Sequence, residues 1–105
     1  MVTKLTTDNF EAEVLKNEKP VLVDFYADWC GPCRMMGPLV EKISDEMKDQ
    51  IKVGKVNVDE NQELAVKYGV QSIPMLIVFK NGAVAGSTLG LQSEEDLKAV
   101  IQKVL

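Results

Sequence analysis

The stretch VLVDFYADWCGPCRMMGPLV, residues 21–40, decides the fold of this chain. Its first six residues are apolar with one exception and rich in Val and Phe, which is typical of a buried strand over residues 21–26. Beyond the two cysteines, apolar side chains recur at helical spacing and predict a helix with one face on a core. These side chains belong to Met36, Leu39, Val40, Ile43 and Met47. Pro38 lies inside this predicted helix and is expected to kink it.

Another helix is predicted upstream of this stretch, after TTDNF at residues 6–10. Thr7 or Asp8 can cap it, and Asp8 with Glu11 has the spacing of a capping box. The side chains expected on its inward face are those of Phe10, Val14 and Leu15. The N-terminal segment therefore adds a helix to the unit of residues 21–40.

The segments downstream continue the alternation of strands and helices. IKVGKVNV at residues 51–58 predicts a strand, and Asp59 can cap a short helix over residues 60–68. MLIVFK and AVAGSTL, joined by Asn81-Gly82, predict a β-hairpin with a two-residue turn. Ser93 has capping spacing for a last helix, whose apolar positions give the strongest helical pattern in the chain. These positions are Leu97, Val100, Ile101, Val104 and Leu105.

With a strand placed before the first helix, the predicted order of elements is strand, helix, strand, helix, strand, helix, hairpin and helix. Its first half indicates parallel strands joined by right-handed helical crossovers, and the hairpin adds an antiparallel pair. We therefore expect an α/β fold in which a mixed central sheet of about five strands carries about four helices on its two faces. The length of 105 residues fits a single domain over residues 1–105.

The composition argues against several classes of function. The chain has 12 basic and 16 acidic residues, a formal net charge of −4 and no Lys/Arg cluster, so nucleic acid is not expected as a partner. No apolar run approaches the ~20 residues that cross a bilayer, so no membrane association is expected. The opening MVTKLTTDNF has no apolar signal-peptide core, and a cytoplasmic location is expected. Histidine, the commonest general base and metal ligand, is absent.

Cys30 and Cys33 are the only cysteines, and three interpretations of the pair compete. A structural zinc site needs four ligands, usually Cys and His, and this chain has two cysteines and no histidine, so no metal site is expected. A structural disulfide stabilises mainly by closing a long loop, whereas this loop is very short. The third interpretation, a reactive pair, has more support.

The position of the pair between a strand and a helix supports the reactive interpretation. A CxxC motif beside a strand-helix-strand pattern is a redox signature. The helix begins at the motif, which puts Cys30 at or near its N-cap, where free N–H groups and the helix dipole favour the nucleophilic thiolate. Cys33 lies about one helical turn further on, so its sulfur can come back beside that of Cys30. Pro32 suits the first helical turn, because no hydrogen bond is lost there.

Asp24 is the only charged residue in the predicted strand over residues 21–26. On a central strand covered on both faces, its carboxyl group would be buried. Burial raises the pKa of a carboxyl group, which would suit a proton acceptor near neutral pH. The alternative is a side chain that reaches solvent, and the residues themselves leave both interpretations open.

The chain resembles the thioredoxin family in four segments. They are VDFYADWCGPCRMMGP at residues 23–38, KVNVDEN at 55–61, YGVQSIPMLIVFKNG at 68–82, and Gly90 before the last helix. The resemblance covers essentially the whole chain, and WCGPC is highly specific. It implies the thioredoxin fold and a general protein-disulfide reductase, an oxidoreductase that cycles between dithiol and disulfide.

The resemblance implies roles for the reactive residues. Cys30 is the nucleophile that attacks a disulfide of a target protein, and Cys33 resolves the mixed disulfide. The attacking thiol is expected to be exposed and the resolving thiol more buried. Asp24 acts as the proton acceptor that helps to deprotonate Cys33, and Lys55 lies near Asp24 and modulates it. The alternative for Lys55 is a solvated strand lysine.

The resemblance also implies a groove for the target protein. A cis peptide bond is expected before Pro74, which packs against the disulfide, and the backbone of Ile73 is expected to pair with an extended target segment. The other groove residues would be Trp29, Gly31, Pro32, Gly90 and Leu91. The alternative for Trp29 is an ordinary core residue.

Tyr26, Arg34 and Met75 stand where many family members carry Trp, Lys and Thr, which bears on substrate preference rather than on the chemistry. The partners implied are disulfide-containing target proteins and a thioredoxin reductase, either an NADPH-dependent flavoprotein or a ferredoxin-linked enzyme. A monomer is expected, with no bound cofactor beyond the redox-active disulfide. A disulfide oxidase or isomerase on the same fold, and a binding module that uses the apolar groove, remain as alternatives.

Overall fold

A five-stranded sheet in the order β1-β3-β2-β4-β5 forms the centre of the computed structural model, which describes residues 1–105. The strands are β1 (Thr3–Leu5), β2 (Val21–Tyr26), β3 (Lys52–Asn57), β4 (Met75–Lys80) and β5 (Ala83–Leu89). β1, β3 and β2 run parallel, and β4 runs antiparallel to both β2 and β5. The predicted mixed sheet is confirmed, and β2 has the predicted bounds.

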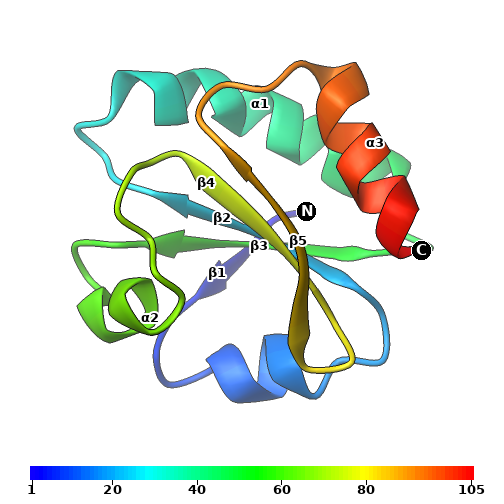
Figure 1. Cartoon of the computed structure of the whole chain (residues 1–105), viewed down its shortest axis with the longest axis horizontal. Helices are drawn as coiled ribbons and strands as arrows, with labels where there is room; N and C mark the ends of the chain where they lie inside the picture. The colour runs from blue at the N-terminus through cyan, green and yellow to red at the C-terminus, as the bar shows by residue number, and fades with distance from the viewer.

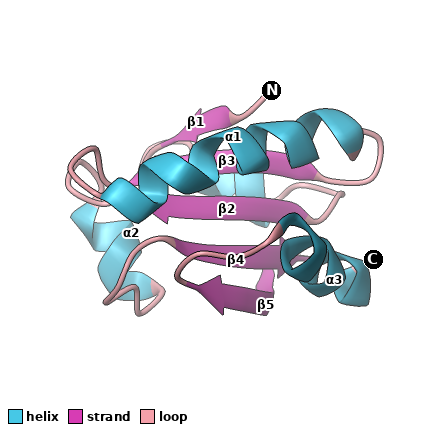
Figure 2. Cartoon of the chain, turned by 90° about the horizontal axis from the view of Figure 1, so that it is seen from above, coloured by secondary structure: helices cyan, strands magenta, loops and turns pink.

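Helices cover both faces of this sheet, as predicted. They are η1 (Glu11–Leu15, a single π-type turn), α1 (Gly31–Glu46), α2 (Gln62–Lys67) and α3 (Glu94–Val104). Figure 2 shows α1 and α3 on one face, and Figure 1 shows α2 and the N-terminal helical turn on the other side of the strands. None of these helices combines the length and the apolar character that a membrane crossing requires.

The alternation of side chains along β2 determines which residues lie beneath α1. Leu22 belongs to the core on the α1 and α3 side, together with Met36 of α1. Val23 and Phe25 belong to the core on the opposite side. Because successive side chains of a strand point to opposite faces, Asp24 lies on the same face as Leu22. The fold therefore places the one charged side chain of β2 beneath the helix that begins at the cysteines.

The hairpin turn and the cap of the last helix are as predicted. Asn81 and Gly82 have φ angles of 54° and 80°, the left-handed conformation that a two-residue hairpin turn requires. Ser93 caps α3, since its Oγ accepts the N–H of Asp96 at 3.0 Å. The inward position predicted for Leu105 is wrong: the helix ends one residue earlier, and Leu105 is 47% exposed.

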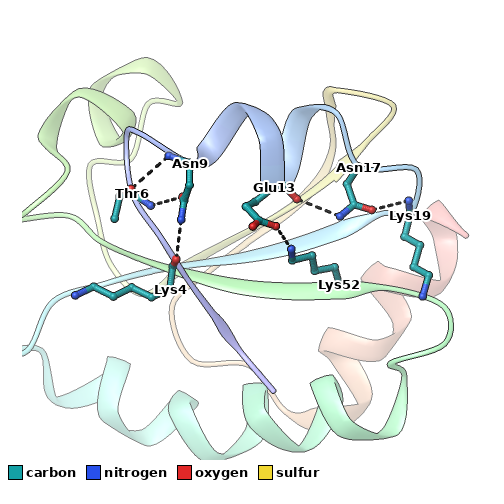
Figure 3. A network of polar contacts seen from close by, with 7 residues as sticks. All are labelled: Lys4, Thr6, Asn9, Glu13, Asn17, Lys19 and Lys52. Atoms are coloured by element: carbon teal, nitrogen blue, oxygen red, sulfur yellow. Dashed lines mark hydrogen bonds and ion pairs between the residues drawn. The ribbon is translucent and has the colours of Figure 1, made fainter.

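The cap predicted for the first helix is wrong. Neither Thr7 nor Asp8 caps η1, which has no side-chain cap. The turn before it is held by Thr6 and Asn9: the Asn9 N–H donates to Thr6 Oγ1 at 3.4 Å, and the Thr6 N–H donates to Asn9 Oδ1 at 2.7 Å (Figure 3). Asn9 can hold this turn because an amide side chain both accepts and donates hydrogen bonds. Its Nδ2 also donates to the Lys4 carbonyl at 3.1 Å.

Asp59 does not cap the short helix that follows β3. The residue at the N-cap of α2 is Asn61, and it makes no side-chain cap bond. Its Oδ1 accepts the N–H of Thr7 at 3.0 Å instead, which ties the loop before α2 to the N-terminal segment. The carboxylate of Asp59 accepts the indole N–H of Trp29 instead, a contact described below.

Candidate active site

Cys30 occupies the N-cap position of α1. β2 ends at Tyr26, a short loop follows, and α1 begins at Gly31. Cys30 has an extended backbone (φ −86°, ψ 110°), and its Sγ accepts the N–H of Cys33 at 3.2 Å. The predicted position is confirmed. The sulfur therefore lies at the positive end of the helix dipole, where a thiolate is stabilised.

Cys30 and Cys33 form a disulfide, with their Cα atoms 5.2 Å apart. Both cysteines are only 4% exposed, because Ala27 packs with them and Tyr26 and Ile73 pack around this cluster. The expected contrast between an exposed Cys30 and a more buried Cys33 is therefore wrong for the disulfide state. No group of three or more His, Cys, Asp or Glu side chains is placed to hold a metal ion.

The opposite wall of the site comes from the loop before β4. The Ile73–Pro74 peptide bond is cis, as expected. The carbonyl oxygen of Ile73 lies 3.9 Å from the Sγ of Cys30. The N–H of Gly90 donates to the carbonyl of Pro74 at 2.9 Å. The structure therefore brings together three parts of the chain that are far apart in sequence.

The remaining groove residues predicted from the sequence are neighbours in sequence of Cys30 and Gly90. Trp29 is 69% exposed and Leu91 is 51% exposed, so both side chains offer apolar surface to a partner. The indole N–H of Trp29 donates to Oδ2 of Asp59 at 2.9 Å, so the interpretation of Trp29 as a core residue is wrong. Pro32 is exposed and Gly31 half-buried in the first turn of α1. No polar contact joins these side chains to the disulfide.

Asp24 lies beneath the cysteines and is buried. It is 5% exposed, and its Oδ1 has no hydrogen-bond partner, so the interpretation of a side chain that reaches solvent is wrong. With Cys33 it lines a cavity of about 210 Å³. Burial raises the pKa of Asp24 from 3.8 to about 7, and the positive charge of Lys55 opposes this shift. A carboxyl group with a pKa near neutrality can exchange a proton with a neighbouring thiol.

Lys55 lies on β3 directly opposite Asp24 in the parallel register of β2 and β3. Its side chain is exposed and lines the same cavity, and its Nζ lies 5.6 Å from the centre of the Tyr26 ring. No ion pair joins Lys55 to Asp24. The lysine therefore acts on the Asp24 carboxyl group through its charge and remains in contact with water.

Three contacts near the site were not predicted from the sequence. Asp59 binds the Trp29 indole, the Arg34 Nη1 donates to the carbonyl of Asp28 at 2.8 Å, and Gly37 lines the Asp24 cavity. The sequence contained one indication of the contact between Asp59 and Trp29. Asp59 and Trp29 both follow the carboxyl ends of neighbouring parallel strands, which meet at one edge of a sheet.

Comparison with known proteins agrees with this geometry. The family model described as Thioredoxin matches residues 1–103. A thioredoxin of Rickettsia bellii (strain RML369-C) is 47% identical over 97 residues, which cover 92% of each chain. A thioredoxin of Rickettsia felis is 45% identical over 98% of each chain, and one of Porphyra purpurea is 42% identical over 99% of this chain and 97% of its own. The chain therefore belongs to the thioredoxin family, and its Cys30–Cys33 disulfide makes it a protein-disulfide oxidoreductase.

Proposed function

We propose that the chain is a general reductase of protein disulfides, with Cys30 as the nucleophile and Cys33 as the resolving thiol. The observation that carries this proposal is the N–H of Cys33 that donates to the Sγ of Cys30 at the head of α1. In the dithiol form the same geometry favours a thiolate at Cys30, because the free N–H groups and the helix dipole stabilise negative charge.

The reduction proceeds in two displacements. The Cys30 thiolate attacks one sulfur of the target disulfide, which forms a mixed disulfide and releases one target thiolate. Cys33 then loses its proton, and its thiolate attacks the Cys30 sulfur and releases the second target thiolate. The two target thiolates take up two protons. The target disulfide thus becomes a dithiol, while the two cysteines of the chain become the disulfide seen in the structure.

Asp24 is the proton acceptor for Cys33 in the second displacement. The cavity that the two residues share and the unpartnered Oδ1 of Asp24 support this role. A water molecule in this cavity would complete the proton path. Lys55 modulates the step, because its charge holds the Asp24 pKa lower than burial alone would.

The target segment binds in a groove beside the disulfide. Its residues are Trp29, Gly31, Pro32, Ile73, Pro74, Gly90 and Leu91. The backbone of Ile73, whose carbonyl lies beside Cys30, pairs with an extended target segment in the manner of strand addition. The exposed apolar side chains of Trp29 and Leu91 contact it and give affinity with little sequence preference.

A thioredoxin reductase restores the dithiol, and an NADPH-dependent flavoprotein is favoured over a ferredoxin-linked enzyme. No bound cofactor is required, because the two sulfurs carry both electrons. We expect a single domain over residues 1–105 that works as a monomer in the cytoplasm. Analytical ultracentrifugation and cell fractionation check the last two expectations.

Trapping of mixed disulfides tests the proposed function. Cys33→Ser removes the resolving thiol and should accumulate covalent complexes with target proteins, which a reductant releases. Cys30→Ser is the matched control and should trap few. If neither variant forms such complexes and both keep full biological activity, the chain acts as a binding module. A reduction potential close to those of disulfide oxidases would favour the oxidase alternative.

A further inference from the structure

Gly37 is a glycine that neither the backbone nor the packing requires. It lies in the interior of α1, where glycine is less stable than alanine. The glycines with a positive φ angle are Gly69, Gly82 and Gly90, and Gly37 is not among them. Apart from its chain neighbours and the nearby backbone of α1 itself, a Cβ atom at position 37 would meet no heavy atom within 4 Å. Neither a left-handed backbone nor a close contact therefore accounts for the glycine at this position.

The cavity beside Asp24 offers a reason for it. Gly37 lines it together with Asp24 and Cys33, and the cavity volume of about 210 Å³ is large enough for several water molecules. The Oδ1 of Asp24 is buried and has no hydrogen-bond partner in the protein, as expected for an atom that accepts a hydrogen bond from water. Gly37 is exposed, as are the lining residues Asp28, Arg34 and Lys55, so the cavity that holds this buried carboxyl group opens to solvent on the side of Gly37 and these residues.

We propose that Gly37 is a positioning residue for the resolving step: by carrying no side chain, it keeps open the space through which water reaches the Asp24 carboxyl group and Cys33. This inference rests on the proposed function, in which Asp24 accepts the proton of Cys33. The proton leaves the Cys33 thiol, crosses to the Asp24 carboxylate directly or through water, and is later released to solvent by the same opening. The Cys33 thiolate left behind attacks Cys30.

The surroundings of Asp24 determine the direction of the expected effect. The titratable and charged groups that line the cavity are Cys33 and Arg34 of α1, Tyr26 of β2, Asp28 of the loop and Lys55 of β3. Burial is the main cause of the raised Asp24 pKa, and only Lys55 opposes it. A side chain at position 37 would exclude water and strengthen the effect of burial, so the pKa of Asp24 would rise further.

Two substitutions at this position separate cavity filling from helix stabilisation. Gly37→Ala and Gly37→Leu both introduce strong helix formers, but leucine adds a much larger side chain at this lining position of the cavity. We expect Gly37→Leu to move the pH midpoint of the resolving step upward. A rise of one pH unit from about 7 would slow the step roughly five-fold at pH 7, with recovery at higher pH. Gly37→Ala should move the midpoint less. Ala99→Leu, which adds the same side chain on the exposed face of α3, should leave it unchanged.

The measurements are the stopped-flow rate of mixed-disulfide resolution from pH 5 to 9 and the Asp24 pKa from NMR titration of its carboxyl carbon. Asp24→Asn is measured in parallel. If Asp24→Asn leaves the wild-type pH profile unchanged, the role proposed for Asp24 fails. If Asp24→Asn removes the profile while Gly37→Leu keeps both the wild-type midpoint and the wild-type Asp24 pKa, the inference about Gly37 fails alone. An upward shift of both in Gly37→Leu, beyond that in Gly37→Ala, supports it.

Discussion

Replacement of Asp24 by asparagine should stabilise the fold, and increasingly so as the pH rises. The side chain is 5% exposed, and burial raises the pKa of its carboxyl group from 3.8 to about 7. The folded state therefore favours the protonated acid, and ionisation of Asp24 destabilises the fold between these two pH values. Asparagine has nearly the same shape and cannot ionise, so this destabilisation disappears in the variant.

The magnitude follows from the two pKa values. Each pKa unit corresponds to about 1.4 kcal/mol, so ionisation of Asp24 destabilises the wild type by about 4 kcal/mol above pH 7. Below pH 3.8 the carboxyl group is protonated in both the folded and unfolded chain, and this contribution vanishes. The free-energy cost of burying the amide of Asp24→Asn is the same at every pH. The pH-dependent part of the difference is therefore the quantity to measure.

Urea unfolding of the disulfide form, followed by circular dichroism at pH 3.5, 5, 7 and 9, measures this difference. The free energy of unfolding of Asp24→Asn relative to the wild type should grow with pH and level off above about pH 7. Asp49→Asn, which removes an exposed carboxylate outside the Asp24 cavity, is the matched control and should show no such growth. A difference that is constant with pH, or that shrinks as the pH rises, would refute the reasoning.

Three further substitutions test separate parts of the site and fold. Lys55→Gln removes the charge that opposes burial, so the pKa of Asp24 should rise above about 7 in an NMR titration and the resolving step should slow at pH 7; an unchanged pKa would contradict the role of Lys55. Asp59→Ala removes the acceptor of the Trp29 indole and should raise the KM for a protein disulfide up to about five-fold, which corresponds to about 1 kcal/mol for a hydrogen bond; an unchanged KM would show that this exposed contact does not position Trp29. Ser93→Ala removes the cap of α3 and should lower the free energy of unfolding by about 1 kcal/mol in urea, whereas Ser93→Asp should preserve it.

The local architecture around the cysteines could be predicted because it depends on neighbours in sequence. The apolar run of β2 and the helical spacing after it located both elements, and the change from strand to helix placed Cys30 at the N-cap. The turn at Asn81-Gly82 and the cap at Ser93 followed from residues only a few positions apart. The sequence by itself therefore determined where the reactive pair lies and why a thiolate is favoured there.

Predictions failed where distant segments compete for the same group. Asn61 binds the Thr7 backbone from across the fold rather than capping its own helix. Asp59 could equally have capped that helix, and the choice of Trp29 as its partner depends on the packing of two loops. Local capping rules do not contain this information, because they consider only the donors of the nearest turn.

The tertiary structure decided the rest of the site. A charged residue in an apolar strand could have faced water. In the fold, Asp24 lies beneath α1, is buried, and lines a cavity together with Cys33. The meeting of Cys30 with Ile73 across 43 positions of sequence likewise depends on the pairing of β2 with β4. The physical reason is the same in both cases. Local propensity determines where a strand or helix forms and which residue caps it. The burial of a side chain, and with it the pKa of a carboxyl group, depends on which distant segments pack against that side chain.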